Sequence, residues 1–365
     1  MRIVRPAAAH LKDLQPYDPK YLPARVYLNA SESPYGMPEK AREKFMRMLA
    51  DEPIHRYPDP LANDLRKALA DKHALSPGCI VIGNGGDELL FNLCLAYGGK
   101  GRSLLIAPPT FSSYQTDALL TYTTLIEVPR MESVDSEGTL RLGVDEAAIL
   151  ECASSGNIDL IMLASPNNPT GDCLSRNFIN ELLEATDAVV LIDQAYIEFA
   201  DPCYDAMPLL KDHANLAILR TFSKAYGLAG MRIGYLAANT EIANELRKVR
   251  QPYSVNTVSA LAALAALGEE AEVQRTVDNM ITDRVLLTHD VGPRGVGLPV
   301  TESEANFVLV KVPGAQEVWQ RLYDEYGILV RNFSALPGLT DCLRVSIGTP
   351  EENTEFLQAL RNILK

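Results

Sequence analysis

The sequence lacks the short patterns that mark several large classes of protein. Its 6 cysteines form no CxxC pair and its 5 histidines form no HExxH motif. We therefore expect neither a disulfide framework nor a zinc site. The longest apolar stretches, such as Ala260 to Leu267, are much shorter than a helix that spans a bilayer. Residues 1–14 contain no continuous apolar core of the length found in signal peptides.

Positive charge is also scarce and dispersed. The 365 residues include 34 Lys and Arg against 47 Asp and Glu, which gives a net charge of −13. No run of basic residues is present, so we do not expect a surface for nucleic acid or for an anionic membrane. Scattered cysteines are typical of proteins whose thiols stay reduced. The composition therefore predicts a soluble cytoplasmic protein.

Two glycine-rich stretches come close to nucleotide-binding motifs but fail their requirements. The stretch from Gly83 has Glu88 where a dinucleotide fingerprint needs its third glycine, and the next predicted strand ends at Pro108 without a ribose-binding acid. Residues 98–101 have the wrong spacing for a P-loop, and no Ser or Thr follows Lys100. The first stretch can still bind a phosphate, because its glycines allow close approach and a helix predicted over residues 89–96 offers free N–H groups.

Predicted strands and helices alternate from about residue 76 to residue 236. Apolar runs at residues 80–82, 103–107, 159–163, 188–192 and 216–219 are typical of buried strands. The alternation predicts an α/β fold with a three-layer large domain around a mostly parallel sheet, followed by a smaller α+β domain. Residues 133–143 are expected to form a polar loop with a short hairpin. We expect an N-terminal arm over residues 1–45 that belongs to the small domain, a large domain over 46–255 and a small C-terminal domain over 256–365.

One stretch combines groups that suit an aldehyde cofactor carrying a phosphate. Lys224 follows Thr221 and Ser223, and Arg232 lies eight positions after the lysine. A lysine amine becomes nucleophilic only when burial or cationic neighbours disfavour its charged form. Ser, Thr and Arg are donors that bind phosphate. Taken alone, the stretch is equally compatible with a solvated loop.

Polar groups follow two of the predicted buried strands. Asp193 ends the apolar run at 188–192, and a loop stiffened by two prolines, residues 165–171, follows the strand predicted at 159–163. Parallel α/β sheets bind their ligands at this end of the strands. An isolated buried carboxylate is costly, so Asp193 needs a partner, for which a protonated pyridine nitrogen would serve. The alternative is that Asp193 only caps the next segment.

Eight motifs occur in a fixed order along nearly the whole chain. They are LNASESPYG (28–36), RYPDP (56–60), GNGGDE (83–88), PTF (109–111), SPNNPTG (165–171), DQAYIEF (193–199), the lysine segment (221–234) and LRVSIG (343–348). This ordered set resembles the fold-type I pyridoxal-phosphate (PLP) aminotransferases, and within them the histidinol-phosphate aminotransferases. The order of the set is far more specific than any single member.

The resemblance implies a role for each matching residue. Lys224 would form an imine with PLP and move a proton, Asp193 would hold the pyridine nitrogen proton, and Tyr196 would bond the phenolic oxygen. The implied catalytic residues are Lys224, Asp193 and Tyr196. The implied cofactor-binding residues are Gly85, Gly86, Asp87, Phe111, Asn168, Asp193, Tyr196, Thr221, Ser223, Lys224, Arg232 and Tyr57.

The resemblance also implies a substrate site and a homodimer. An arginine in an apolar strand is costly unless an anion meets it, and the family pattern makes Arg331 and Arg344 ligands of the substrate phosphate and of the carboxylates of glutamate. Asn29 and Tyr35, in the N-terminal arm, would line the same site. Tyr57 would reach the cofactor phosphate of the other subunit.

The reaction implied is transfer of the amino group of histidinol phosphate to 2-oxoglutarate. An aromatic amino-acid aminotransferase and a threonine-phosphate decarboxylase of the same branch stay open, as does a PLP-binding regulatory protein without turnover. The sequence departs from the family pattern at three positions. Ser31 stands where Asn is usual, Gly86 where Ser is frequent and Gln194 where Glu is usual.

Overall fold

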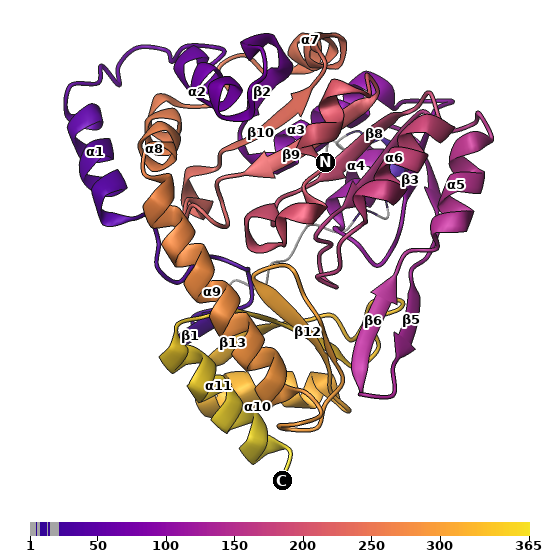
Figure 1. Ribbon diagram of the computed structural model, residues 1–365, viewed down its shortest axis with the longest axis vertical. Coiled ribbons are helices and arrows are strands. Elements are labelled where there is room, and N and C mark those ends of the chain that lie inside the picture. Colours follow the sequence, from indigo (N-terminus) through magenta and orange to yellow (C-terminus); the bar gives the residue numbers. More distant parts are fainter. Residues whose placement is uncertain (1–4, 6–7, 13, 15–21) are drawn as a thin grey trace.

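A computed structural model describes residue 5, residues 8–12, residue 14 and residues 22–365. The predicted N-terminal arm therefore lies partly outside the described residues. The chain forms two sheets, each with its own helices. In the view of Figure 1, one sheet lies in the upper part of the molecule and the other in the lower part. Within the described residues, no helix combines the length and the apolar character needed to cross a membrane.

The first sheet has seven strands, and six of them run in the same direction. Its order is β2-β10-β9-β8-β7-β3-β4. Neighbours from β9 to β4 pair in parallel, whereas β10 is antiparallel to both β2 and β9. The strands are β2 (Ile80–Gly83), β3 (Ser103–Ile106), β4 (Thr124–Glu127), β7 (Leu160–Ala164), β8 (Val189–Asp193), β9 (Leu216–Thr221) and β10 (Gly234–Ala238).

Both faces of this sheet are buried. Successive side chains of a strand point to opposite faces, so each strand contributes to two core clusters. In β7, for example, Ile161 belongs to one core cluster, whereas Leu160 and Met162 belong to the other. The cluster of Leu160 includes helices α3 (Gly85–Tyr97), α4 (Ser113–Leu120) and α7 (Thr240–Val249). The cluster of Ile161 includes helices α2 (Asn63–His73), α5 (Glu146–Ser154), α6 (Arg176–Ala185) and α8 (Thr257–Leu267). The predicted three-layer arrangement is thus confirmed.

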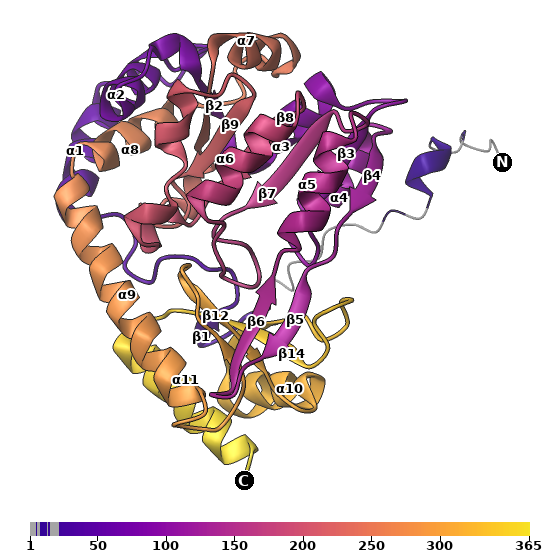
Figure 2. The same cartoon turned by 45° about the vertical axis from the view of Figure 1, so that its right-hand side comes forward.

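The second sheet joins distant parts of the chain. Its order is β1-β13-β14-β12-β11-β6-β5, and three helices, α9, α10 and α11, lie beside it (Figures 1 and 2). Its strands are β1 (Val26–Leu28), β5 (Met131–Val134), β6 (Thr139–Gly143), β11 (Val300–Thr301), β12 (Phe307–Lys311), β13 (Ile328–Asn332) and β14 (Cys342–Ser346). The helices are α9 (Glu270–Val291), α10 (Ala315–Tyr326) and α11 (Pro350–Ile363). Helix α1 (Glu39–Ala50) lies apart from them, against α8.

Several helices begin at a side chain that satisfies a free backbone N–H of the first turn. Thr349 forms a reciprocal capping box with Glu352 at the start of α11. Single caps come from Asp145, Ser175, Asn239 and Asn256. Short 3-10 turns lie at η1 (Ala9–Leu11), η2 (Pro77–Cys79), η3 (Ile197–Phe199), η4 (Pro202–Tyr204), η5 (Met207–Lys211) and η6 (Ala229–Met231).

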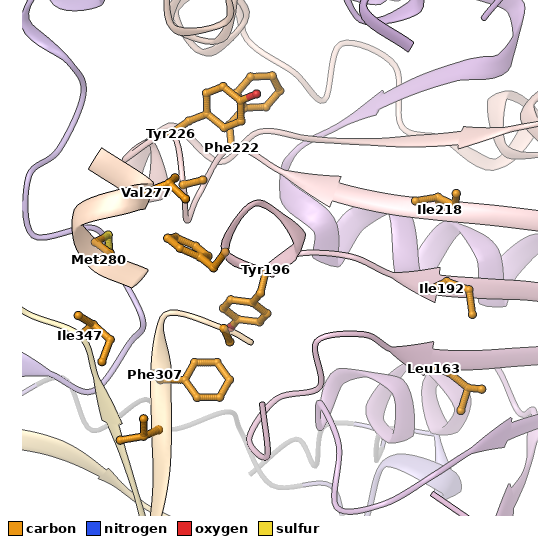
Figure 3. Packing of buried hydrophobic residues seen from close by; sticks show 14 of the residues in the cluster. Leu163, Ile192, Tyr196, Ile218, Phe222, Tyr226, Val277, Met280, Phe307 and Ile347 are labelled. Atoms are coloured by element: carbon orange, nitrogen blue, oxygen red, sulfur yellow. The ribbon is translucent and has the colours of Figure 1, made fainter. Parts of the chain in front are cut away.

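One apolar core continues from the first sheet to the second. Figure 3 shows Ile192 of the first sheet, Tyr196 just beyond it, Met280 of α9 and Phe307 of the second sheet in the same cluster. Helix α9 runs the full way between the two parts (Figure 2). Strands β8 and β9 are therefore joined to the second sheet by continuous apolar packing.

Three local expectations differ from the structure. The sequence did not indicate β10, which runs antiparallel in an otherwise parallel sheet. The hairpin of β5 and β6 pairs through β11 with the second sheet, although its residues lie between strands of the first. Helix α3 begins at Gly85 and not at Leu89, so Gly85, Gly86 and Asp87 form its first turn. The domain boundaries at residues 45 and 255 remain a prediction.

Candidate functional site

Lys224 lies in the loop that follows β9. Phe222 and Tyr226 on either side of it are buried, with ring centroids 4.7 Å apart, and they fix the loop. The Nζ of Lys224 donates to the carbonyl of Ala30 at 2.8 Å and lies 5.5 Å from the centre of the Tyr196 ring. Burial lowers the pKa of Lys224 to about 7, and the charges of Arg344 and Arg232 act in the same direction. This amine is therefore neutral far more readily than an exposed lysine.

Asp193 ends β8 in the protein interior, where it is 6% exposed. Its Oδ2 accepts from the hydroxyl of Tyr114 at 2.8 Å, and its Oδ1 accepts from the backbone N–H of Ala195 at 3.0 Å. Burial raises the pKa of Asp193 to about 6, although both hydrogen bonds favour the carboxylate. The bond to Ala195 is of the capping kind considered above. The bond to Tyr114 holds the carboxylate in place beyond what a cap requires.

The first turn of α3 and Arg232 form a cradle suited to an anion. Gly85 has φ +79, and a Cβ added there would lie 2.6 Å from Nη2 of Arg232. Glycine therefore lets the guanidinium approach the start of the helix, whose first N–H groups have no partner within the helix. The same Nη2 donates to Asp87 at 2.9 Å. These residues fit the phosphate of the cofactor that the sequence predicts.

Thr221 and Ser223 lie beside this cradle at the end of β9. The hydroxyl of Thr221 donates to the hydroxyl of Ser223 at 3.0 Å and accepts from its backbone N–H at 3.1 Å. Both side chains are largely buried. Two hydroxyl groups in this position add neutral donors to a site that already holds a guanidinium and a helix N-terminus.

Arg344 connects the second sheet with the loop of Asn168. Its Nη1 donates to Oδ1 of Asn168 and its Nη2 donates to the carbonyl of Asn29, both at 2.6 Å. Its guanidinium lies 5.0 Å from the ring centre of Phe307 and 5.6 Å from that of Phe333. We expected that a buried arginine in this apolar strand would need an anion. Other partners can also satisfy such an arginine. Carbonyl oxygens and aromatic rings do so in this structure.

Arg331 stands opposite Arg344 on the neighbouring strand. The two residues are Cα partners in the antiparallel pair of β13 and β14. The guanidinium of Arg331 lies 5.9 Å from the ring centre of Phe333. The two predicted substrate arginines therefore come from adjacent strands and share an aromatic neighbour.

The aromatic residues predicted for the site differ in position. Tyr196 is largely buried and lies edge-on to Phe307, with centroids 5.1 Å apart. Phe111 meets Tyr114 edge-on at 5.8 Å, so a single side chain separates it from Asp193. Tyr57 is 83% exposed and stacks on Tyr253 at 4.7 Å. Tyr57 is therefore not brought together with Lys224 of its own chain.

Tyr35 is the second arm residue predicted for the site, and its neighbour Gly36 lies directly against Gly227 of the lysine loop. Its side chain is 41% exposed. Burial raises its pKa, and so do the charges of Asp283, Glu351 and Glu352 on helices α9 and α11. Of the arm residues, Asn29 touches Arg344 through its backbone carbonyl, whereas Tyr35 faces these acidic groups.

Two of the three departures from the family pattern have local explanations. Ser31 has φ +51, and its backbone bonds Ser346 and Asn306. Gln194 donates to the carbonyl of Tyr204 at 3.1 Å and accepts from Arg220 at 3.3 Å. Arg220 has its counter-charge in Asp205, at 2.6 Å. With a neutral side chain at position 194, Arg220 keeps Asp205 as its ion-pair partner, and the charge of Glu198 also acts on it.

The sequence did not single out Tyr114, Phe307, Phe333 or the carbonyl of Ala30. Tyr114 lies within α4, 79 positions from the aspartate it bonds. Its only local signal is that it follows Phe111 by three residues, and in the structure the two rings meet edge-on. No local pattern marks a backbone carbonyl as the partner of a distant lysine.

A family model now decides the class of the chain. The model of the family described as aminotransferase class I and II matches residues 24–360 of the chain. The chain belongs to this family. Relatives of this aminotransferase include histidinol-phosphate aminotransferase 1 of Carboxydothermus hydrogenoformans, 38% identical over 96% of both chains. The histidinol-phosphate aminotransferase of Chlorobaculum tepidum is 35% identical over 93% of this chain and 94% of its own.

Solved structures agree with the fold of the aminotransferase. The histidinol-phosphate aminotransferase of Sinorhizobium meliloti, solved in complex with pyridoxal-5'-phosphate, has a TM-score of 0.87 at 24% identity and covers 99% of this chain and 98% of its own. The L-threonine-O-3-phosphate decarboxylase of Porphyromonas gingivalis has a TM-score of 0.77 at 26% identity, with 93% and 99% covered. The predicted fold-type I architecture is thus confirmed. Because the same fold serves a decarboxylase, fold alone does not choose the reaction.

Proposed function

We propose that this aminotransferase uses PLP to transfer the amino group of histidinol phosphate to 2-oxoglutarate, giving imidazole acetol phosphate and glutamate. The observation that carries the proposal is the position of Lys224, a lysine with a pKa near 7 in a loop between a buried carboxylate and an anion cradle. The names of the curated relatives support the choice of substrate.

The residues present fit PLP. The first turn of α3, with Gly85 to Asp87, and the side chains of Thr221, Ser223 and Arg232 would hold its phosphate. Asp193 would keep the proton on its pyridine nitrogen. Asn168 and Tyr196 would bond its phenolic oxygen, and Phe111 would lie against its ring. When bound, PLP supplies an electron sink for the bond that breaks at the substrate carbon.

Lys224 would have two tasks. As a neutral amine it can bond the aldehyde carbon, which a charged ammonium cannot do. As a neutral base beside the substrate, it would also accept a proton from the substrate carbon and give one back. General acid–base transfer of this kind is fastest when the pKa lies near the working pH. The largest cause of the lowered pKa of Lys224 is burial, with Arg344 second.

Arg331 and Arg344 would bind the substrate anion. Charge-assisted bonds from a guanidinium to phosphate are short and strong. A phosphate monoester carries more charge than the single carboxylate of an aromatic amino acid, so two adjacent arginines favour the phosphorylated substrate. Binding would require Arg344 to exchange at least one of its bonds to Asn168 and Asn29 for the anion. Asn29 and Tyr35 remain proposed contacts of the arm.

We also propose a homodimer in which Tyr57 reaches the phosphate of the partner's PLP. The 83% exposure of this large aromatic side chain supports the proposal. A mixture of Lys224→Ala and Tyr57→Ala chains should regain activity, because one of its two shared sites would be intact. An active monomer in sedimentation would contradict the shared site. A cytoplasmic location stays a prediction.

The test of the reaction is a panel of amino donors. The purified enzyme, loaded with PLP and 2-oxoglutarate, should release glutamate fastest with histidinol phosphate, and much more slowly with phenylalanine, tyrosine or histidinol. Preference for the aromatic amino acids would favour the aromatic aminotransferase. Carbon dioxide released from threonine phosphate would favour the decarboxylase. PLP binding without turnover of any donor would favour a regulatory protein.

A further inference from the structure

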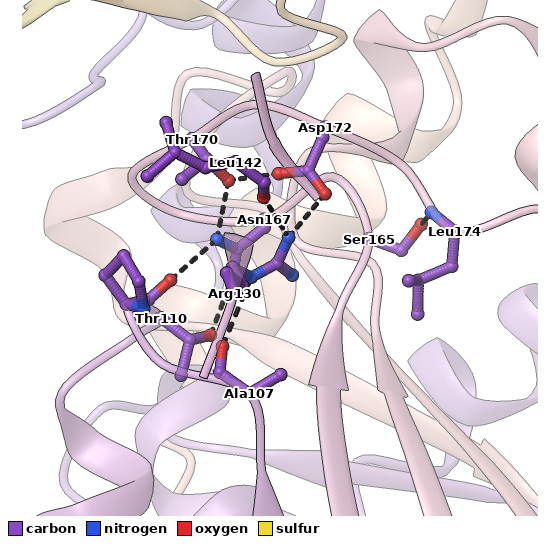
Figure 4. A network of polar contacts seen from close by, with 10 residues as sticks. Ala107, Thr110, Arg130, Leu142, Ser165, Asn167, Thr170, Asp172 and Leu174 are labelled. Atoms are coloured by element: carbon purple, nitrogen blue, oxygen red, sulfur yellow. Dashed lines mark hydrogen bonds and ion pairs between the residues drawn. The ribbon is translucent and has the colours of Figure 1, made fainter. Parts of the chain in front are cut away.

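A buried cation outside the predicted site ties together the loops that carry Phe111 and Asn168. Arg130 lies between β4 and β5, and only 1% of its side chain is exposed. Its Nε donates to the carbonyl of Ala107 at 3.2 Å. Its Nη1 donates to the carbonyl of Leu142 at 3.1 Å and to Oδ2 of Asp172 at 2.5 Å (Figure 4). One guanidinium therefore joins the end of β3, strand β6 and the loop after β7.

The side chain of Asn167 makes a second connection between the same loops. It is fully buried. Its Nδ2 donates to the carbonyl of Pro109 at 3.1 Å and to the hydroxyl of Thr170 at 2.7 Å, and its Oδ1 accepts from the hydroxyl of Thr110 at 2.7 Å. The hydroxyl of Thr170 in turn donates to Asp172. Arg130, Asp172, Thr170, Asn167 and the 107–110 segment thus form a continuous network (Figure 4).

The network restricts the conformation of Asn168, which lies between Asn167 and Thr170 in the chain. The backbone N–H of Asn167 donates to the carbonyl of Asp172, and that of Gly171 donates to the carbonyl of Asn167, each at 2.8 Å. Gly171 also lies directly against the connection between β11 and β12, because an added Cβ would stand 2.2 Å from the hydroxyl of Ser303. Asn168 is enclosed in this closed loop, and its Oδ1 points at Arg344. Its amide nitrogen is the end of the side chain that can donate to a ligand.

We propose that Arg130 is a positioning residue which, through Asp172 and Asn167, fixes the two loops that present Phe111 and Asn168 to the cofactor ring. The inference rests on the proposed function. The chemistry explains why an arginine is used: three acceptors from three segments require a planar cation with several donors, which a lysine cannot supply in this geometry. Arg130 itself would touch no substrate or cofactor atom and would act only through Asp172 and Asn167.

The test compares Arg130→Met with a matched control, Arg66→Met. Arg66 is also largely buried, and its guanidinium also donates to two backbone carbonyls, of Ile80 and Pro77, and to one side chain, of Asn63. It holds the start of β2, away from the two loops. Loss of a buried arginine should lower the melting temperature of both variants, so melting temperature alone does not discriminate between positioning and structure.

Two further measurements do discriminate. In the PLP-loaded enzyme, the pH midpoint of the visible absorbance reports how well the ring and its phenolic oxygen are held. Arg130→Met should move this midpoint upward by about half a pH unit or more, because Asn168 loses its alignment as a donor. It should also lower kcat by about tenfold with little change in KM, as expected for misplaced groups. Arg66→Met should leave the midpoint and kcat unchanged.

Asp172→Asn provides a second, milder variant in case Arg130→Met does not fold. It removes the counter-charge but keeps the size, and it should shift the midpoint in the same direction by a smaller amount. If the variants that fold have a lower melting temperature but keep the wild-type pH midpoint of the absorbance and the wild-type kcat, the network has only a structural role and the inference is wrong. If the wild type shows no visible absorbance with PLP, the proposed function fails first, and this inference fails with it.

Discussion

Asp193 lies in the protein interior with 6% of its surface exposed, whereas the ion pair of Arg232 and Asp87 is open to solvent, with side chains 47% and 56% exposed. The charge of Asp193 therefore acts in a dry environment, whereas the charges of Arg232 and Asp87 act in a hydrated one. Charge interactions are several times stronger in a dry interior than at a wet surface. A single charge at the position of Asp193 can therefore dominate the chemistry. The anion cradle must add several donors, because each alone is weak.

The raised pKa of Asp193 follows from this difference. Burial favours its neutral form, and the two hydrogen bonds from Tyr114 and Ala195 only partly oppose that effect. A cationic ring nitrogen beside the carboxylate would favour the charged form again. With a cationic ring nitrogen beside it, the pKa of Asp193 would fall below the value of about 6 that burial gives it. The exposed pair needs no such partner, since water already solvates it.

Removing the interior charge should have the largest effect. Asp193→Asn keeps the size and one hydrogen-bond acceptor but cannot hold a proton on the pyridine nitrogen. We expect most of the PLP affinity to remain and kcat to fall by a factor on the order of 10³, the equivalent of a few kcal/mol in a dry site. Steady-state rates and PLP titration measure both. As the exposed counterpart, Asp87→Asn should cost no more than about tenfold in rate, and equal losses in the two variants would contradict the comparison.

The two arginines proposed to bind the substrate should show an intermediate effect that depends on the ligand. Arg331→Ala should raise KM for histidinol phosphate about tenfold to a hundredfold more than KM for phenylalanine, the equivalent of about 1–3 kcal/mol. The reason is that phosphate uses both guanidinium groups, whereas a carboxylate leaves one underused. Histidinol serves as the control, since it lacks the phosphate and should be indifferent to the change. A uniform loss for all three donors would show that Arg331 only supports the fold.

The smallest effect concerns the acidity of Lys224. The rate of covalent PLP uptake by the PLP-free enzyme should rise with pH and level off above about pH 7, because only the neutral amine reacts. Arg344→Gln removes a positive neighbour, which favours the charged amine. Its midpoint should therefore move to higher pH. Stopped-flow absorbance across a pH series checks the sign, and a downward shift would show that Arg344 does not act on the lysine through its charge.

The sequence predicted the parts of the site that depend on local order. Lys224 with its neighbouring hydroxyl groups, Asp193 at the end of an apolar run, and the glycines at the start of α3 each have a short-range signal. Strands β2, β3, β7, β8 and β9 were also predicted, because continuous apolar runs are typical of strands buried on both faces. These features need no knowledge of distant residues.

Long-range contacts were not predicted. The bond between Tyr114 and Asp193 joins residues 79 positions apart, and the ion pair of Arg130 with Asp172 joins residues 42 positions apart. Strand β10 resembled a continuation of the loop after Lys224, and only its antiparallel partners β2 and β9 make it a strand. The hairpin of β5 and β6 was expected, but its pairing with the second sheet was not, because the side chains of β5 are all exposed and give no sign of a buried face. When a distant partner determines the position of a side chain or strand, the residues next to it in the sequence carry little information about that position.

The most direct test of the central claim is to trap PLP on the protein. Wild-type enzyme loaded with PLP, reduced with borohydride and digested should yield one modified peptide, the one that contains Lys224. Lys224→Ala should bind PLP only reversibly, yield no modified peptide and lose turnover while keeping its fold. Modification of a different lysine, or turnover near the wild-type rate in Lys224→Ala, would contradict the account.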